Sequence, residues 1–336
     1  MQRLAQEVWR RQPRFVNPET TVGELAWIWG SGHRAAGPQW KYRLWTDGGD
    51  TAAWGWVFAP ITTTLSATTT RSEPTTLVWQ VHPDRPQLLD SVLDWFEAET
   101  AAVVTRQTSS QQANEDAVER LRHHGYEHDS DAPWGLLNTR DLGEIEEPAL
   151  PAGYRLLTMR EIGDVPRRVA VHRAAWEPSR ITETNYTDVM NTWPYRDDLD
   201  FVVEAPDGTL VASAIGWYDE ANRVAEFEPV GTHRDHRRQG LGRALSLFGL
   251  QRFRAAGAEH AIVGCRGDAH YPVPKLLYES IGFRELSREL RFKKGYGPRS
   301  KQPWQSTEYA LEPPPSSWRA CASMPPIPCK KSRIRR

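Results

Sequence analysis

One short segment in the second part of the chain, residues 233–244 with the sequence HRDHRRQGLGRA, combines residue types that can bind an anion. Gly240 and Gly242 let main-chain N–H groups approach a ligand closely, and the segment leads into a predicted helix whose first N–H groups attract phosphate. Arginines, which suit bidentate contact with phosphate, surround these glycines. We predict a phosphate-binding loop; a basic solvated turn is the alternative. The segment lacks the third glycine of a Rossmann fingerprint, and no Walker A motif occurs.

Two glutamates lie on a predicted strand just before this loop. Glu226 and Glu228 alternate along the strand, and its periodicity predicts that they share a face with Val230 and Thr232. Close like charges and partial burial raise the pKa of a carboxyl group toward neutral pH, which makes it a better general base. The pair is therefore a candidate for proton removal. Two glutamates on a solvated strand face are the alternative interpretation.

The elements that must position these residues occur twice in the chain. Three segments recur in the same order, separated by roughly 150 to 160 residues. They are a hairpin (42–58 and 200–218), a strand leading into a helix (77–84 and 228–235), and a helix ended by glycine before a strand (117–127 and 273–285). Each copy mixes strands and helices, which predicts an α/β fold with a mixed, twisted sheet flanked by helices.

Composition places the boundaries between the parts. Residues 143–153 are acidic, contain proline and lack periodicity, so we predict a linker there. This gives a first domain over residues 1–142 and a second over residues 154–294. Residues 295–336 are rich in Pro and Ser and end in basic residues, which predicts a disordered basic tail.

Charge and composition exclude several classes of protein. The net charge of -1 and the pI near 6.8 argue against a dedicated nucleic-acid-binding protein. The neutral total hides an uneven distribution, because residues 291–336 hold 11 Lys/Arg and 2 Asp/Glu, which leaves a net charge of -10 on the rest. No apolar run is long enough for a membrane span, and the 3 cysteines form no metal-spaced set. We expect a cytoplasmic protein without a metal site, as a monomer or a homodimer.

Two motifs resemble those of a known family, the GNAT acyltransferases. Residues 237–242 (RRQGLG) are similar to the family's R/Q-x-x-G-x-G/A signature, and residues 276–283 (LLYESIGF) to its Tyr-x-x-x-Gly-Phe motif. The resemblance covers residues 154–294. The first copy resembles a degenerate unit, with Leu121 at the position of Tyr278. The whole chain thus resembles tandem GNAT proteins such as the mycothiol synthases, which implies two tandem GNAT folds, acetyl-CoA as acyl donor, and activity in the second unit.

The resemblance also implies roles for individual residues. Glu226 occupies the position of the general base, with Glu228 as its close competitor, and Tyr278 corresponds to the acid that protonates the CoA thiolate. A base is needed because a primary amine is almost wholly protonated at pH 7. Asp268 lies where many family members carry an asparagine. The expected cofactor-binding residues are Val230, Thr232, Arg237, Arg238, Gln239, Gly240, Leu241, Gly242, Arg243 and Asp268.

The acceptor is less well defined by the sequence. Aromatic and acidic residues cluster in the region expected to frame the acceptor pocket and suit a cationic small amine, although they can equally be packing residues. They are Trp176, Tyr186, Trp193, Tyr195, Asp197, Asp198 and Asp200. The predicted function is direct transfer of an acetyl group from acetyl-CoA to the amine of a small molecule in a ternary complex. The alternative is a noncatalytic acyl-CoA sensor or interaction module.

Overall fold

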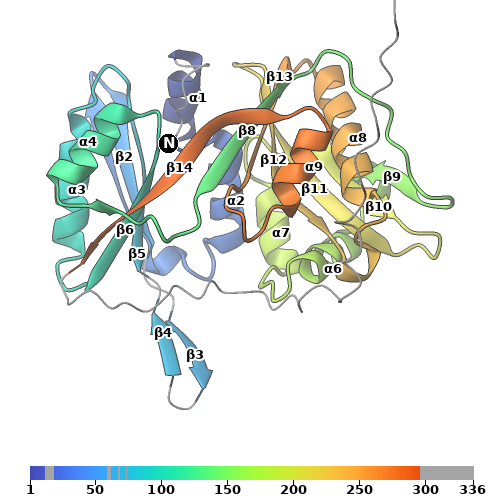
Figure 1. Ribbon diagram of the computed structural model, residues 1–336, viewed down its shortest axis with the longest axis horizontal. Helices are drawn as coiled ribbons and strands as arrows, with labels where there is room; N and C mark the ends of the chain where they lie inside the picture. Colours follow the sequence, from blue (N-terminus) through green and yellow to red (C-terminus); the bar gives the residue numbers. More distant parts are fainter. Residues whose placement is uncertain (12–18, 59–61, 67–68, 73, 296–336) are drawn as a thin grey trace, which may run out of the picture. The chain divides into compact units, whose positions relative to one another are not determined.

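The structure is a computed structural model, and it describes residues 1–11, 19–58, 62–66, 69–72 and 74–295. The predicted tail lies outside the described residues from residue 296 onward. Apart from one small hairpin, the described strands join in a single mixed sheet of 12 strands with helices on its faces (Figure 1). The fold class predicted from the sequence is therefore confirmed. Within the described ranges, no helix is long and apolar enough to cross a membrane.

We call residues 1–142 the first half of the chain. It opens with two helices and continues with the first copy of the repeated unit. Its helices are α1 (Gln2–Arg11), α2 (Val22–Gly32), η1 (Gly37–Gln39), α3 (Leu88–Glu99) and α4 (Glu115–His123). Its strands are β1 (Lys41–Asp47), β2 (Asp50–Phe58), β3 (Thr62–Ser66), β4 (Thr69–Ser72), β5 (Thr75–Val81), β6 (Thr105–Gln111), β7 (Glu127–His128) and β8 (Gly135–Asp141).

Residues 154–295 form the second half. Its helices are α5 (Met159–Ile162), α6 (Val165–Ala175), α7 (Glu183–Met190), η2 (Asp197–Leu199), η3 (Arg234–His236), α8 (Leu241–Ala256) and α9 (Val273–Ser280). Its strands are β9 (Arg155–Thr158), β10 (Asp200–Glu204), β11 (Leu210–Asp219), β12 (Val224–Thr232), β13 (His260–Arg266) and β14 (Arg284–Gly295).

The three repeated segments adopt matching structures. The hairpin β1–β2 corresponds to β10–β11, and both are antiparallel. The amide of His82 donates to Ala52 O at 2.8 Å, and the amide of His233 donates to Val211 O at the same distance. Gly125 after α4 and Gly282 after α9 both have a positive φ, at 78° and 86°. The internal repeat found in the sequence is therefore present in the fold.

The last strand of each half pairs with the other half. β8, from the first half, lies antiparallel to β13, and β14, from the second half, lies antiparallel to β6. β8 and β14 also pair with each other, so the sheet runs without a break from β1 to β9. In Figure 1, β14 can be followed from α9 across to β6. The division into sequential domains at residues 143–153 remains a prediction, because the two halves share these strands.

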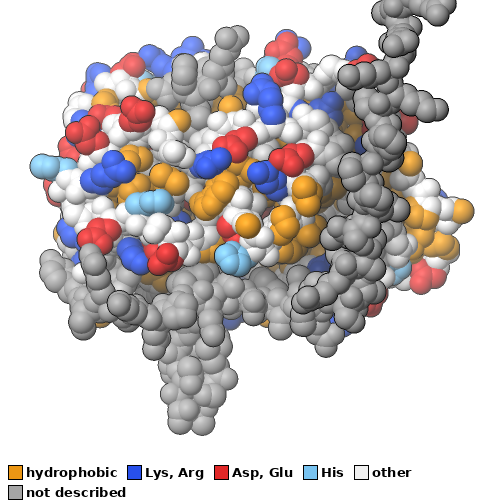
Figure 2. All heavy atoms as spheres, viewed as in Figure 1, with side chains coloured by type: hydrophobic (Ala, Val, Ile, Leu, Met, Phe, Trp, Pro, Cys, Tyr) orange, Lys and Arg blue, Asp and Glu red, His pale blue; other side chains and the backbone are white. Residues whose placement is uncertain are grey.

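Helices cover both faces of the second-half sheet. On one face, α8 packs Leu245 and Phe253 against Phe227 of β12. On the other face, α2 and α7 pack Ala26 and Tyr186 against Trp217 of β11. β12 therefore runs between a second-half helix and a first-half helix. Where Figure 2 shows described residues, acidic and basic side chains are interspersed, so neither sign of charge forms a continuous patch on that face of the molecule.

Candidate active site

The strands β12 and β13 separate halfway along their length. They pair in parallel only from Val224 to Phe227 on β12 and from His260 to Val263 on β13. From Val230 to Thr232, β12 pairs with β11 on one side and has no strand partner among the described residues on the other. We call this separation the second-half fork. It leaves main-chain groups of β12 available to a ligand, as the sequence analysis expected around Val230 and Thr232.

A β-bulge changes which face of β12 each residue occupies. Glu226 pairs with Trp217 and Phe227 with Gly216, but Val230 pairs with Ala214. Two β12 residues therefore oppose one residue of β11 between these pairs, and the alternation shifts by one position. Val230 and Thr232 consequently lie on the Phe227 face, opposite Glu226. The predicted common face for Glu226, Val230 and Thr232 is wrong, because simple alternation does not allow for the bulge.

Glu226 is buried beneath the start of α2. The residue is only 7% exposed, and its Oε2 atom accepts no hydrogen bond from the described part of the chain. A Cβ atom built on Gly23 would lie 2.5 Å from this oxygen, so the α2 backbone is in direct contact with the carboxyl group. Burial raises the pKa of Glu226 to about 8, hydrogen bonding with the Thr21 side chain and the Gly23 backbone opposes this rise, and the charges of Glu24 and Glu228 add to it.

Glu228 lies at the fork itself. Its main-chain carbonyl accepts a hydrogen bond from Trp217 Nε1 at 2.6 Å, which fixes the strand at the bulge. Burial first, and then the charge of Glu24, raise the pKa of Glu228 to about 7. Both β12 carboxyl groups therefore change protonation near neutral pH. The proton-removing role expected from the sequence stays a prediction.

Tyr278 of α9 shares this environment. The residue is buried, packs edge-on against Phe283, and belongs to the core beneath α8. Burial raises the pKa of Tyr278 well above its ordinary value, and the charge of Glu228 is the next cause. The phenol is therefore protonated at neutral pH and can donate its proton.

The N-terminus of α8 is open. Gly240 precedes it with φ 78°, a conformation that favours glycine. Within the described residues, the amides of Leu241, Gly242 and Arg243 donate to no protein acceptor. A Cβ atom on Gly242 would lie 3.4 Å from Thr232 Oγ1, so this helix end stands beside the end of β12. Free N–H groups and the helix dipole suit a phosphate at this position.

Several polar residues of the loop already have partners in the chain. Two arginines form ion pairs, Arg234 with Glu177 at 2.9 Å and Arg243 with Glu146 at 2.7 Å. Arg237 donates to the carbonyls of Thr232 and Ala175 at 3.2 and 3.3 Å. Gln239 accepts a hydrogen bond from Tyr154 at 3.2 Å. The Arg234 and Arg243 pairs are at the surface, where such pairs contribute little and can be exchanged for a phosphate. Arg237 instead holds the end of β12 against α6. Arg238 has φ 64°, so the loop carries some backbone strain there.

Asp268 also has local partners. Its carboxylate pairs with Arg266 at 2.8 Å and accepts from the amide of His270 at 3.1 Å. The bond to Arg266 holds the pKa of Asp268 below its ordinary value. Asp268 therefore stabilises the loop between β13 and α9, and its contact with a cofactor stays a prediction.

The predicted acceptor residues divide into two groups. Tyr186 and Tyr195 donate hydrogen bonds to Asp200, which forms a fully buried ion pair with Arg168. This network belongs to the core, which supports the packing interpretation for these residues. Asp197 and Asp198 pair with arginines at the surface. Trp176 and Trp193 are 40% and 52% exposed, so these two indoles are accessible to a ligand.

The first half contains a corresponding fork that its own side chains fill. β5 and β6 pair only from Thr75 to Leu77 on β5, and then separate. Glu19 lies at this separation, where its carboxylate accepts hydrogen bonds from the amide of Gln111, the hydroxyl of Ser110 and the amide side chain of Asn114, each at 2.9 Å. Its own amide donates to Gln80 Oε1 at 2.9 Å. A carboxylate of the chain thus takes up donors of the first-half fork.

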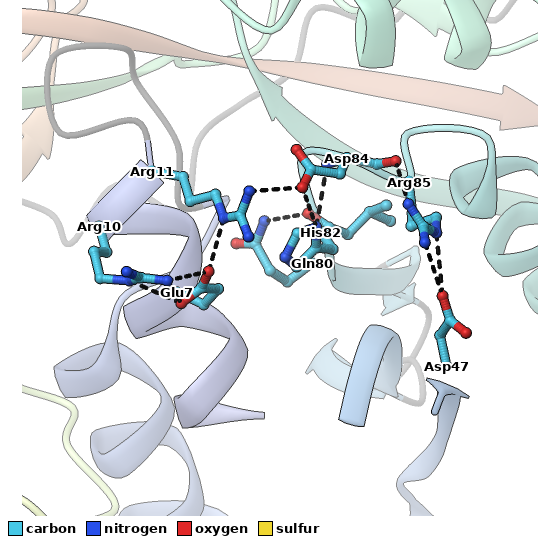
Figure 3. Close-up of polar contacts among 9 residues, drawn as sticks. Glu7, Arg10, Arg11, Asp47, Gln80, His82, Asp84 and Arg85 are labelled. Atoms are coloured by element: carbon cyan, nitrogen blue, oxygen red, sulfur yellow. Dashed lines mark hydrogen bonds and ion pairs between the residues drawn. The ribbon is translucent and has the colours of Figure 1, made fainter. Parts of the chain in front are cut away.

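The loop after β5 is also closed. The amides of Leu88, Leu89 and Asp90 at the start of α3 all donate to carbonyls of the preceding turn. The loop's charged residues are paired, Arg85 with Asp47 at 3.0 Å and Asp84 with Arg11 at 2.6 Å (Figure 3). A cavity of about 170 Å³ remains beside Gln80 and His82. The first half therefore lacks the open helix end found at α8.

Sequence reasoning missed the contribution of α2 to the site. This helix belongs to the first half, yet it packs on β11, β12 and α7 of the second half. Its glycines at 23 and 30 permit the contact, because Cβ atoms there would lie 2.4 Å from Trp217 Cγ and 2.6 Å from Val189 Cα. Two glycines seven residues apart in an apolar helical run were the signal that could have revealed it.

Comparisons with known proteins agree with the fold and the motifs. Residues 168–283 match the acetyltransferase (GNAT) family. Mycothiol acetyltransferase of Saccharomonospora viridis is 29% identical over 168 residues, covering 45% of this chain and 53% of that protein. Mycothiol acetyltransferase of Streptomyces coelicolor is 26% identical over 154 residues, covering 45% of this chain and 49% of that protein. The chain thus aligns with about half the length of the curated relatives that it matches.

Two solved structures share the fold over nearly the whole described chain. A tandem GNAT protein from the clavulanic acid biosynthesis pathway has a TM-score of 0.58 at 18% identity, covering 89% of this chain and 95% of that chain. A GCN5-related N-acetyltransferase from Sphaerobacter thermophilus has a TM-score of 0.57 at 17% identity, covering 88% and 92%. At these identities the likeness concerns the fold. It confirms the tandem GNAT fold expected from the sequence.

Proposed function

Because residues 168–283 of this chain form a domain of the GNAT acetyltransferase family, we propose that the chain is an N-acetyltransferase that moves an acetyl group from acetyl-CoA to the amine of a small molecule. The second-half fork is the proposed site. The observation that carries the proposal is the combination at this fork of an open α8 N-terminus, two carboxyl groups that titrate near neutral pH, and a protonated tyrosine. The mycothiol acetyltransferases named above support acetyl transfer as the reaction.

Binding of the acyl donor is assigned to main-chain groups. The free amides of Leu241, Gly242 and Arg243 would hold the diphosphate of acetyl-CoA, with Arg238 and Arg243 adding charge. The unpaired edge of β12 at Val230 and Thr232 would hold the pantetheine and the thioester carbonyl. Main-chain donors of this kind stabilise the negative charge that develops on the carbonyl oxygen. Acetyl-CoA supplies the activated acetyl group.

Proton movements are assigned to the side chains. The pair Glu226 and Glu228 takes a proton from the acceptor ammonium, and the neutral nitrogen attacks the thioester carbonyl as the carbon–sulfur bond breaks. Tyr278 donates its proton to the departing thiolate, and the second proton that the nitrogen loses as the amide forms passes to solvent, from which the tyrosine is reprotonated. The two carboxyl groups influence each other, so their pKa values of about 8 and 7 belong to a coupled pair that titrates around the working pH. A base with such a pKa suits neutral conditions.

Three substitutions test these roles. Glu226→Gln, Glu228→Gln and Tyr278→Phe should each lower kcat for acetyl transfer by about 10²–10⁴-fold, because each removes one proton-transfer group. Acetyl-CoA binding, measured by calorimetry, should be retained. Tyr218→Phe is the matched control, since Tyr218 is a buried tyrosine that lies beside Gly257 at the far end of α8. Near-normal turnover in all three variants would contradict the assignment.

The alternative function, a noncatalytic acyl-CoA sensor, gives a different outcome in the same assay. A sensor would bind acetyl-CoA and transfer no acetyl group when a panel of amines is offered. The open α8 N-terminus is consistent with both functions. The carboxyl pair and Tyr278 favour the enzyme, because a binding module has no need of groups poised to exchange protons.

A further inference from the structure

Strand β1, at one end of the sheet, has an uncovered outer edge. It pairs with β2 on one side, and among the described residues no strand pairs with its other side. Its residues are exposed except Trp45, which is partly buried and packs edge-on against Trp95 of α3. Such an edge presents main-chain N–H and C=O groups that another strand can use. The edge of β1 is therefore open to one more strand.

The second copy of the repeat shows which strand is missing beside β1. The hairpin β1–β2 corresponds to β10–β11, and β9 pairs antiparallel with the outer edge of β10. With β9 in place, every residue of β10 is buried. Among the described residues of the first half, no strand occupies the position that β9 has in the second. The first copy is thus one strand short at this edge.

The apolar face of the first-half sheet continues onto β1. Tyr42 and Leu44 lie opposite Trp56 and Trp54 of β2. The two tryptophans are buried beneath α1 and α2, whereas Tyr42 is 61% and Leu44 47% exposed. Single exposed apolar residues are common in proteins, but these two share one face of an uncovered edge strand. A strand added beside β1 would bury part of both side chains.

The sequence of β1, KYRLWTD, is complementary to itself when two copies run antiparallel. With a two-fold axis at Leu44, Lys41 lies opposite the partner's Asp47, and Arg43 lies opposite the partner's Trp45. The first pair joins opposite charges, and the second places a guanidinium beside an indole. A parallel alignment in register would instead place like charges side by side. Charges on an edge strand usually prevent association, but here they favour one orientation of it.

The charged residues at the ends of β1 remain accessible to a second chain. Lys41 pairs with Glu99 at 2.8 Å, and Asp47 pairs with Arg85 at 3.0 Å. All four side chains are at least 39% exposed. Ion pairs at such exposed positions contribute little to stability. Lys41 and Asp47 can therefore turn to a second chain at small cost.

We propose that β1 is a homodimer interface, in which the β1 strands of two copies of this chain pair antiparallel about a two-fold axis at Leu44. The interface is isologous, because each copy contributes the same surface, and it joins the two 12-stranded sheets into one. The self-complementary sequence of β1 favours a second copy over any other strand. The second-half fork lies elsewhere in the sheet, so this inference does not depend on the proposed acetyl transfer. One strand makes a small interface, and we expect a dimer that dissociates at about micromolar concentration.

Analytical ultracentrifugation of the full chain from about 1 to 100 µM tests the dimer. Wild-type protein should show a monomer–dimer equilibrium. Leu44→Lys should weaken the dimer about tenfold or more, because it places two like charges on the axis. Val104→Lys is the matched control, since Val104 is 67% exposed and lies between α3 and β6, and it should leave the dimer unchanged. A monomer across the whole range, or equal effects of the two substitutions, would overturn the proposal.

An exchange of the end charges tests the orientation of the strands. Lys41→Asp alone places acids opposite each other at both ends of the paired strands and should weaken the dimer. Lys41→Asp combined with Asp47→Lys restores opposite charges across the axis and should recover most of the affinity. Within one chain the double exchange disrupts the pairs with Glu99 and Arg85, so a recovery has to come from the second chain. An affinity of the double variant no better than that of Lys41→Asp would rule out this arrangement.

Hydrogen exchange distinguishes a second copy from a segment of the same chain at the edge. In the wild type, amides of β1 should exchange more slowly at about 100 µM than at about 1 µM, because the partner strand protects them only in the dimer. In Leu44→Lys they should exchange quickly at both concentrations. Slow exchange that is independent of concentration and persists in Leu44→Lys would mean that the chain covers its own β1, and would overturn the proposal.

Discussion

Glu226 and Glu204 are both buried glutamates of the second-half sheet, yet their surroundings shift their pKa values in opposite directions. Arg155 and Arg167 hold the pKa of Glu204 below its ordinary value through hydrogen bonds. Glu226 has no such partner, and burial raises its pKa to about 8. Arginines thus keep Glu204 ionised, whereas burial keeps Glu226 protonated and likewise raises the pKa of the structural Glu19 to about 7. The contrast between Glu204 and Glu226 has a measurable consequence for stability.

Stability should fall as the pH rises through the pKa of the fork carboxyl group. An unfolded chain ionises Glu226 near pH 4.5, whereas the folded protein holds the proton until about pH 8, so folding is favoured below this window and weakened across it. Glu226→Gln should therefore raise Tm at pH 8 by about 2 °C or more and change it little at pH 5. Glu204→Gln should lower Tm at pH 8, since its stabilising charge is present above pH 4.5. Thermal melts at both pH values check this, and equal shifts for Glu226→Gln at the two values would contradict it.

At the residue scale, sequence reasoning succeeded where chemistry is local. The glycine at 240 has the positive φ that a tight turn before a helix requires. The roles of Glu226, Glu228 and Tyr278 stay predictions. Sequence reasoning failed for Val230, because a β-bulge depends on how β12 pairs with β11 and leaves no mark in the alternation of one strand. It did not foresee that Arg237 donates to the main-chain carbonyls of Thr232 and Ala175, and contact of Arg237 with a cofactor stays a prediction. Residue type was predictable, but the partner of each residue was not.

Among the elements, α2 depends most on close backbone contact. Gly23→Ala should destabilise the protein by about 1–3 kcal/mol, because the added Cβ would lie 2.4 Å from Trp217 Cγ and overpack the interface. Gly30→Ala should behave alike, as its Cβ would meet the Val189 backbone at 2.6 Å. Gly264→Ala is the control, since nothing lies within 4 Å of its Cβ and its φ is not in the left-handed region. Urea denaturation measures the effect, and a cost at Gly264 equal to that at Gly23 would show that close approach is not the cause.

The two forks should differ in their affinity for acetyl-CoA. Glu19 takes up donors of the first-half fork, and the first amides of α3 are used by the preceding turn, whereas the corresponding amides of α8 have no acceptor in the described part of the chain. We therefore expect calorimetry to give one acetyl-CoA bound per chain. Gly240→Val should weaken this binding strongly, because a β-branched residue does not adopt the φ of 78° that opens the helix end. A stoichiometry of two would show that the first half also accepts the ligand.

For the molecule as a whole, the sequence predicted the duplication but not the exchange of strands. The repeat appears in the hairpins and helix ends because each is specified by nearby residues, such as the glycines that end α4 and α9. The exchange involves β8, which pairs with β13, and β14, which pairs with β6. Periodicity indicates that a segment is a strand and which of its faces is buried, but it does not indicate which strand it pairs with. The candidate site likewise draws on both halves, since α2 of the first half packs on β12 of the second.

The exchanged strands should make the two halves inseparable once folded. A protease site inserted between Glu147 and Pro148 would cut the chain in a segment without helix or strand. After cleavage, β8 would still lie against β13 and β14 against β6, so the fragments should elute together as a 1:1 complex in gel filtration and unfold in one transition, as the uncut insertion variant does. A second-half fragment produced alone would expose the edge of β13 that β8 covers, and we expect it to aggregate. Separation of the cut fragments under native conditions, or two well-resolved transitions in the intact chain, would mean that each half is stable without the other's strand.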